Sequence, residues 1–282
     1  MRSFIHEDDQ TKDEELTMNE QEILKRAAAT REHLTAAHRP AVDFSGSPRI
    51  AADAPLARYF DHTLLKPEAT AAQYQMLCEQ AREYGTRSVC VPPDRVELCG
   101  SYLAGSAVEV CTVIGFPLGY HSTSAKVTEV EMATSVGATE FDMVIPIGRL
   151  RDGDVNAIYD DVRAVVAAAG SQIVKVILET ALLNDEQKVD AAAAAIHAGA
   201  AILKTSTGFS TAGATVEDLK LFRLIAGESR GVKAAGGIRD LSFARACVEA
   251  GADRIGASST GAILDEAAGR SGPSKSTGGD SY

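Results

Sequence analysis

Residues 172–205 read QIVKVILETALLNDEQKVDAAAAAIHAGAAILKT. The stretch begins and ends with short apolar segments, Gln172–Leu178 and Ala201–Thr205, whose length is typical of buried strands. Between them, Asn184-x-x-Gln187 has the pattern of a capping box and opens an alanine-rich helical segment that ends near Gly199. A strand, a helix and a second strand in this order indicate a βα repeat.

The same alternation continues on both sides of this stretch. From about residue 57 onward, apolar segments recur roughly every 20 to 35 residues, which is the repeat length of a βα unit. Eight such units make a closed barrel of typical size. The predicted strands are Tyr59–Leu65, Arg87–Val91, Val108–Ile114, Thr139–Ile145, Gln172–Leu178, Ala201–Thr205, Gly231–Ala235 and Arg254–Ala257.

The segments between the strands carry signals for helix ends. Thr70-x-x-Gln73 predicts a capping box, and Gly85 predicts the end of the same helix. Gly170 closes a helical stretch with apolar positions from Val155 onward. Gly199, Gly231 and Gly251 precede strands, where a short turn requires a positive φ. A doubly wound sheet of eight strands would show the same local pattern.

Four charged residues interrupt the apolar strands. Asp142, Lys175, Lys204 and Lys233 fall on the fourth, fifth, sixth and seventh predicted strands, in that order. A buried charge costs several kcal/mol unless it is paired or functional. In a barrel, charges on successive strands converge at the mouth, where reacting groups project from the C-terminal strand ends. We therefore predict a (β/α)₈ TIM barrel with an N-terminal helical extension.

Clustered lysines have a specific chemical use. A protonated amine cannot attack a carbonyl, but a second ammonium nearby disfavours the charged form and brings the pKa down to roughly 7–8. The neutral amine then condenses with an aldehyde or ketone to give an iminium, which withdraws electrons. Asp142 would take or relay protons through bound water. The alternative is a buried structural network of ions without catalysis.

Small residues follow the seventh and eighth predicted strands. Gly236-Gly237 and Gly256-Ala-Ser258-Ser259 would let backbone N–H groups approach an anion at the position where this fold commonly binds phosphate. Thr205, Thr207 and Gly208 lie on the same rim, beside Lys204. These residues form the predicted substrate-binding set.

These motifs together resemble the deoxyribose-phosphate aldolase family over about residues 57–265. The most specific pieces are Lys204-Thr-Ser-Thr-Gly208 and Lys233-Ala-Ala-Gly-Gly237. The other matching segments are Asp61-His-Thr-Leu-Leu-Lys-Pro67, Ser88-Val-Cys-Val-Pro92, Val113-Ile-Gly-Phe-Pro-Leu-Gly119, Glu140-Phe-Asp-Met-Val144, Lys175-Val-Ile-Leu-Glu-Thr180 and Arg254-Ile-Gly-Ala-Ser-Ser259.

The resemblance implies a reaction and roles for its residues. Lys204 would form the Schiff base with acetaldehyde, Lys233 would depress its pKa, Asp142 would manage protons, and Lys175 would pair with Asp142 or position water. The implied reaction is reversible cleavage of 2-deoxy-D-ribose 5-phosphate into acetaldehyde and D-glyceraldehyde 3-phosphate. No metal or other cofactor is expected, since the iminium replaces a Lewis acid.

Five further residues also have expected roles, at the C-terminus, on the first and second predicted strands and at the rim. The resemblance suggests proton transfer by a C-terminal tyrosine, here Tyr282 after a Gly/Ser-rich segment. Asp61 would hydrogen-bond the substrate, whereas His62 is structural or a hydrogen-bonding residue at the rim. Phe209 stands where some members carry a lysine, which would weaken phosphate binding. Cys90, on a strand that approaches the site, is a place for aldehyde damage rather than a nucleophile.

The composition indicates which partners and which cellular location to expect. Apolar residues make up 45% of the 282 residues, and the net charge is −11, of which residues 1–20 supply −5. An acidic chain without a basic stripe does not favour nucleic acid as a partner. The sequence shows neither a secretory signal nor a membrane span, so we expect a cytoplasmic enzyme acting on small molecules. The five cysteines are expected to be reduced core thiols, with zinc or disulfides as the alternative.

The expected layout is an acidic extension over residues 1–50 with a helix near 18–37, a catalytic barrel over 51–268, and a flexible tail over 269–282. The extension would dock on the barrel or mediate assembly into a homo-oligomer, a dimer or tetramer. Competing functions are another Schiff-base aldolase or transaldolase, a phosphate-binding isomerase, and a sugar-phosphate sensor or scaffold without turnover.

Overall fold

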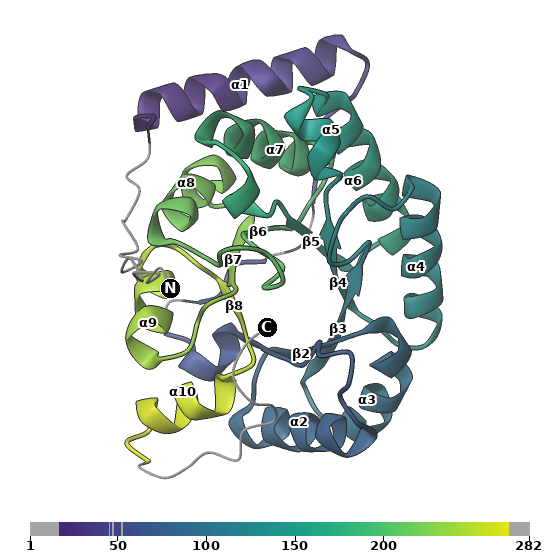
Figure 1. Ribbon diagram of the computed structural model, residues 1–282, viewed down its shortest axis with the longest axis vertical. Helices are drawn as coiled ribbons and strands as arrows, with labels where there is room; N and C mark the ends of the chain where they lie inside the picture. Colours follow the sequence, from purple (N-terminus) through teal and green to yellow (C-terminus); the bar gives the residue numbers. More distant parts are fainter. Residues whose placement is uncertain (1–16, 45, 47, 52, 271–282) are drawn as a thin grey trace, which may run out of the picture.

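The eight predicted strands form one closed barrel. A computed structural model describes residues 17–44, 46, 48–51 and 53–270. Every strand pairs in parallel with its neighbour in the sequence, and β8 pairs with β1 (Figure 1). The strands are β1 Phe60–Thr63, β2 Ser88–Val91, β3 Glu109–Ile114, β4 Glu140–Val144, β5 Ile173–Ile177, β6 Ile202–Lys204, β7 Gly231–Ala235 and β8 Arg254–Ala257. The TIM-barrel prediction is confirmed, and the doubly wound alternative is excluded.

Helices surround the barrel between successive strands (Figure 1). The α-helices are α1 Glu20–Ala36, α2 Ala71–Tyr84, α3 Val96–Leu103, α4 Thr123–Ser135, α5 Ile147–Arg151, α6 Val155–Ala169, α7 Asp185–His197, α8 Val216–Ala226, α9 Leu241–Glu249 and α10 Thr260–Ala267. Three short 3₁₀ helices cover Leu56–Tyr59, Pro93–Arg95 and Thr180–Leu182. No helix in the described part of the chain has the length and apolar character needed to cross a membrane.

The capping signals act where the sequence places them. Thr70 and Asn184 both form capping boxes, and Gly85 ends α2 in the left-handed conformation. Gly199 and Gly251 have a φ of +102° before their strands, as expected. Gly231 differs from these two glycines because it does not precede a strand but is itself the first residue of β7. A Cβ there would lie 2.8 Å from Cγ1 of Ile202, so close packing, not a positive φ, requires glycine.

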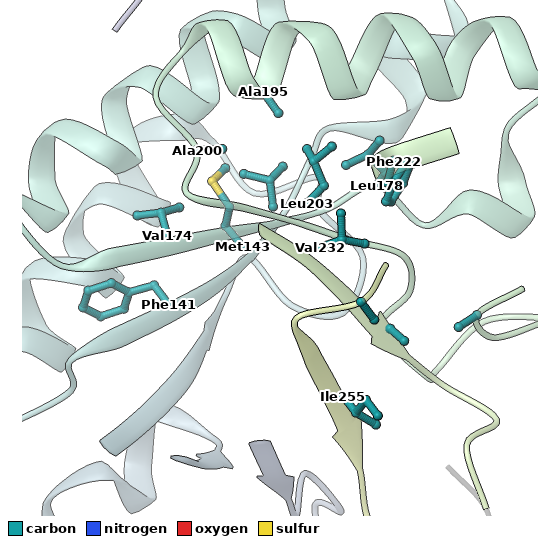
Figure 2. Close-up of a cluster of buried hydrophobic side chains, with 14 of the residues drawn as sticks. Phe141, Met143, Val174, Leu178, Ala195, Ala200, Leu203, Phe222, Val232 and Ile255 are labelled. Atoms are coloured by element: carbon teal, nitrogen blue, oxygen red, sulfur yellow. The ribbon is translucent and has the colours of Figure 1, made fainter. Parts of the chain in front are cut away.

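The apolar core lies between the strands and the helices. Side chains alternate along each strand, so every second residue points outward toward the helices. Phe141, Met143, Val174, Leu203 and Val232 are among these outward residues, and all are buried (Figure 2). The intervening positions face the barrel interior, and these are the positions that carry Asp142, Lys175, Lys204 and Lys233.

The N-terminal helix α1 packs on the outside of the barrel against α7 and α8 (Figure 1). Ile23, Ala27 and Leu34 are buried on its inner face. Arg26 donates two hydrogen bonds to Asp190 of α7, at 3.0 and 2.6 Å. Of the two roles left open for the extension, docking on the barrel is therefore observed for this helix.

His62 lies on the outer face of β1, away from the barrel interior. It is buried, and its Nε2 lies 3.0 Å from Oε1 of Gln80 on α2. Of the two roles considered for His62, this position fits the structural one. Burial lowers the pKa of His62 from 6.5 to about 4, and the hydrogen bond that its Nε2 donates to Gln80 opposes the shift.

This histidine predicts an acid-dependent loss of stability. Below pH 6.5 the unfolded chain binds a proton that the folded chain does not bind until about pH 4. The free energy of unfolding should therefore fall by about 3 kcal/mol as the pH drops through this window. Urea titrations of the wild type and His62→Gln at pH 7 and pH 4 test this, since the variant should lose less stability. Equal losses would assign the acid sensitivity to other groups.

Candidate active site

Three lysines converge on one carboxylate inside the barrel. Oδ2 of Asp142 accepts hydrogen bonds from Nζ of Lys204 at 2.7 Å and from Nζ of Lys233 at 2.8 Å. Its other oxygen, Oδ1, accepts one from Nζ of Lys175 at 2.9 Å. Asp142 comes from β4, and the lysines come from β5, β6 and β7. The structure thus brings together the four charges that the sequence places on four successive strands.

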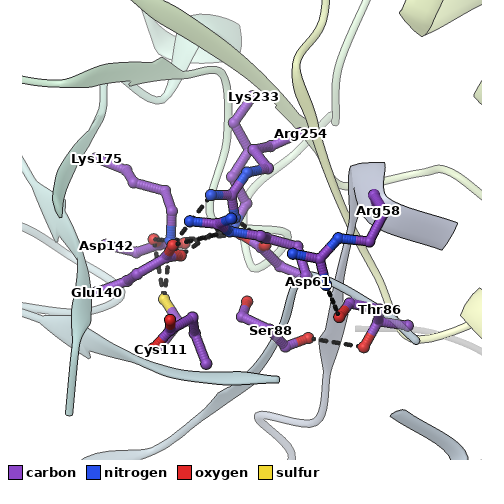
Figure 3. Close-up of polar contacts among 12 residues, drawn as sticks. Arg58, Asp61, Thr86, Ser88, Cys111, Glu140, Asp142, Lys175, Lys233 and Arg254 are labelled. Atoms are coloured by element: carbon purple, nitrogen blue, oxygen red, sulfur yellow. Dashed lines mark hydrogen bonds and ion pairs between the residues drawn. The ribbon is translucent and has the colours of Figure 1, made fainter. Parts of the chain in front are cut away.

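A second set of charges supports the first toward the N-terminal ends of the strands (Figure 3). Arg254, the first residue of β8, donates to Asp61 at 2.7 Å and to Glu140 at 3.0 Å. Lys175 lies 2.8 Å from Glu140 and 3.4 Å from Asp61. Sequence reasoning missed Arg254 and Glu140 because each begins a strand, where a charged residue is unremarkable.

Asp61 occupies a different place from the substrate contact predicted for it. Its side chain is fully buried, with Oδ2 2.6 Å from Nζ of Lys233 and Oδ1 bound to Arg254. Both carboxylate oxygens are therefore held by cations. This geometry makes Asp61 a counter-ion for Lys233.

The ion pairs keep Asp61, Asp142 and Lys233 charged. Burial alone would raise the pKa of Asp142, but Lys175, Lys204 and Lys233 outweigh it and hold that pKa well below its usual range. The pKa of Asp61 is likewise well below its usual range, because nearby cations outweigh burial. Burial would lower the pKa of Lys233, yet Asp142 and Asp61 raise it above its ordinary value. Lys233 is thus a permanent cation near neutral pH.

Lys204 is the lysine of the cluster nearest the mouth. It is the last residue of β6, in register with Lys233 on β7. Its exposed fraction is 3%, whereas Lys175 and Lys233 have none. Gly256 on β8 lets Lys233 pass, because a Cβ at Gly256 would lie 3.1 Å from Cε of that lysine. Lys204 is therefore placed to meet a carbonyl compound that enters from the mouth.

A pocket of about 270 Å³ lies at the same end of the barrel, between the loops that follow β6, β7 and β8, and Lys204 itself does not line it. Its lining includes five residues of the predicted set: Gly208, Gly236, Gly237, Ser258 and Ser259. Arg239 also lines it and adds a cation that the sequence analysis did not single out. The composition suits an anion held by backbone N–H groups and one guanidinium.

Thr205 and Thr207 are buried next to the pocket and do not line it. Oγ1 of Thr205 donates to the carbonyl of Ala235 on β7 at 3.2 Å, and Oγ1 of Thr207 donates to Glu179. Both hydroxyls hold the loop after β6. Phe209 projects at the rim, 41% exposed, and its ring meets that of Phe116 edge to face at 5.3 Å.

Two cysteines lie within the barrel next to the charged cluster. Cys90 and Cys111 are adjacent on β2 and β3, and Sγ of Cys111 lies 3.2 Å from Oδ1 of Asp142. All five cysteines are buried and free, as expected. Among the described residues, Cys90, Cys111 and Asp142 form the one group whose potential metal-ligand atoms all lie within 4.8 Å of one another. The three ammonium groups on Asp142 oppose a metal cation there.

Tyr282 lies outside the described residues, so its proposed proton transfer stays a prediction.

The described site lies inside a closed barrel, with a lysine at the mouth, further lysines and carboxylates beneath it, and a glycine-lined pocket at the same end. This arrangement defines a (β/α)₈ enzyme with a lysine-centred site.

Comparison with known proteins identifies the family. Residues 56–270 match the DeoC/LacD family aldolase. The chain is 52% identical to deoxyribose-phosphate aldolase of Brevibacillus brevis, covering 73% of this chain and 94% of that protein. It is 53% identical to the Streptococcus gordonii enzyme of the same name, covering 74% and 95%. A tetrameric deoxyribose phosphate aldolase from Aeropyrum pernix superimposes with a TM-score of 0.71 at 32% identity, covering 89% and 99%.

The chain belongs to the DeoC/LacD aldolase family. It is therefore an aldolase, a lyase that breaks and forms carbon–carbon bonds. The resemblance drawn from the strand motifs is confirmed.

Proposed function

We propose that this aldolase reversibly cleaves 2-deoxy-D-ribose 5-phosphate into acetaldehyde and D-glyceraldehyde 3-phosphate through a Schiff base on Lys204. The observation that carries the proposal is the position of Lys204 on a carboxylate that it shares with Lys233, at the end of β6 from which a loop runs on to form part of a pocket suited to an anion. The relatives' names give the substrate class. A phosphate in the pocket would direct the sugar's carbonyl end toward Lys204.

The reaction follows from an amine at this position. Neutral Lys204 adds to the substrate aldehyde, and the resulting carbinolamine takes up a proton and loses water to leave an iminium. A base then removes the proton of the C3 hydroxyl, the C2–C3 bond breaks, and its electrons move into the iminium to give an enamine. D-Glyceraldehyde 3-phosphate leaves, C2 takes a proton, and water releases acetaldehyde and the free amine. We assign the proton transfers to Asp142 acting through bound water.

The buried cluster contains more cations than carboxylates. Four buried cations, Lys175, Lys204, Lys233 and Arg254, face three buried carboxylates, Asp61, Glu140 and Asp142. With every group ionised the cluster carries one excess positive charge. Loss of one proton would leave the cluster balanced, and we assign to Lys233 the positive charge that favours this loss.

Replacing Lys233 by methionine should move the ascending limb of the pH–rate profile to higher pH. Methionine keeps the unbranched stem that passes Gly256 but removes the positive charge. Without that charge, the cluster loses the electrostatic repulsion that favours release of a proton. The measurement is kcat/KM between pH 5 and pH 10, with circular dichroism to verify folding. A profile that keeps its midpoint would remove Lys233 from this role.

An assay of substrates tests the proposed reaction. The enzyme should release acetaldehyde from 2-deoxy-D-ribose 5-phosphate, with a kcat/KM well above that for 2-deoxy-D-ribose, which lacks the phosphate. A preference for a ketone donor over acetaldehyde in the reverse direction would instead favour a different Schiff-base aldolase or a transaldolase. Isomerisation without cleavage would contradict the proposal.

Assembly into a homo-oligomer stays a prediction, which light scattering checks.

A further inference from the structure

Glu179 differs from the other buried carboxyl groups of the described chain. Its exposed fraction is 2%, and no lysine or arginine is paired with it. Each of the others has such a partner: Asp61, Glu140, Asp142, Asp161, Asp218 and Asp253. Burying a carboxyl without a cation is costly, so the contacts that Glu179 does make need an explanation.

The backbone of Glu179 is also unusual. Its φ is +58° and its ψ +62°, and His38 is the only other non-glycine residue with positive φ among the described residues. A glutamate in the left-handed region costs about 1–3 kcal/mol. The conformation occurs directly after β5, where the mouth of the barrel begins. The residues on either side of Glu179 also bond to β6 and the loop after it. The backbone N–H of Leu178 donates to the carbonyl of Lys204, and that of Thr180 donates to the carbonyl of Thr205.

The carboxylate of Glu179 reaches across to the loop after β6. Its Oε2 accepts hydrogen bonds from both the backbone N–H of Thr207, at 3.2 Å, and the hydroxyl of Thr207, at 2.5 Å. That hydroxyl in turn accepts from the backbone N–H of Phe209 at 3.0 Å. Gly208, between these two residues, lines the candidate phosphate pocket. Glu179 therefore fixes the turn that forms one wall of the pocket.

The first part of the same loop is held by other contacts. The N–H of Thr205 donates to the carbonyl of Lys233 at 3.1 Å, and its hydroxyl bonds to Ala235. Lys204 and Thr205 are thus fixed by β7, whereas Thr207 and Gly208 depend on Glu179. Loss of Glu179 should consequently disturb the pocket more than the nucleophile.

We propose that Glu179 is a positioning residue that holds the Thr207–Gly208 turn in shape for the phosphate of the substrate. The inference rests on the proposed function, because it assigns phosphate to this pocket. It concerns the hydrogen bonds of Glu179, not its charge. The quantity that reports it is the phosphate preference, defined as kcat/KM for 2-deoxy-D-ribose 5-phosphate divided by kcat/KM for 2-deoxy-D-ribose.

Four variants test this assignment. Glu179→Ala removes both hydrogen bonds and Thr207→Val removes the one from the hydroxyl. Each variant should lower the phosphate preference about tenfold or more, mainly through KM. Glu179→Gln and Thr207→Ser keep an acceptor and a hydroxyl, respectively, and should stay within about threefold of the wild type. The matched control is Thr139→Val, which removes a 2.7 Å hydrogen bond to Glu109 at the N-terminal end of the barrel. The control should leave the preference unchanged.

Two results would overturn the proposal. An unchanged preference in Glu179→Ala would show that the turn holds its shape without this contact. An equal loss in Glu179→Gln and Glu179→Ala would show that the charge matters and the hydrogen bond does not. Failure of the aldolase proposal itself would look different, because the wild type would then not cleave the phosphorylated sugar.

Discussion

Replacing Lys204 by arginine should reduce the rate of cleavage by about 10³-fold or more while the protein remains folded. Arginine keeps a positive charge next to Asp142, but its guanidinium stays protonated and cannot condense with an aldehyde. The loss should appear in kcat for 2-deoxy-D-ribose 5-phosphate, measured by release of acetaldehyde. Lys204→Ala should lose as much, since neither side chain supplies an amine.

The control for these variants is the third lysine on Asp142, Lys175, which is fully buried. Lys175→Met removes a cation from the same carboxylate but leaves the amine of Lys204 in place. It should retain the ability to form the imine. Substantial cleavage by Lys204→Arg would show that another residue is the nucleophile.

Replacing Asp142 by asparagine should lower kcat by about 10²- to 10⁴-fold, the range of a lost general acid–base group. The asparagine side chain has nearly the same shape but carries no charge and has one oxygen instead of two. The three ammonium groups would lose their shared partner, and no carboxylate would remain next to Lys204 to take a proton through water. Steady-state kinetics across the pH range gives the size of the loss.

Asp161→Asn separates this catalytic loss from a general effect of breaking a buried ion pair. Asp161 on α6 pairs with the fully buried Lys126 on α4 at 2.6 Å, outside the barrel interior. This variant should lose stability but keep kcat within a few-fold of the wild type. Equal losses of kcat in both variants would mean that Asp142 contributes to structure alone.

The fold could be predicted from the sequence because each strand carries a local signal. The apolar segments, the capping boxes at Thr70 and Asn184, and the glycine at position 85 are all properties of short stretches. The site followed from a simple physical rule, since a lysine within an apolar strand requires a reason. Lys175, Lys204 and Lys233 met that rule on three successive strands, and the structure brings them to one carboxylate.

Other features depend on contacts between distant parts of the chain. Arg254 and Glu140 looked like ordinary strand ends, and their importance is visible only once β4 and β8 face each other across the barrel. Glu179 belongs to a short loop in the sequence, and its φ of +58° and its bonds to Thr207 are tertiary properties. The docking of α1 on α7 through Arg26 and Asp190 likewise leaves no local signature.

Reduction with borohydride in the presence of acetaldehyde tests the central claim most directly. The imine between acetaldehyde and Lys204 would be reduced to a stable secondary amine, and peptide mapping by mass spectrometry would locate it. We predict a two-carbon adduct on Lys204 in the wild type and none in Lys204→Arg. An adduct confined to another lysine, or no adduct at all, would contradict a Schiff-base mechanism centred on Lys204.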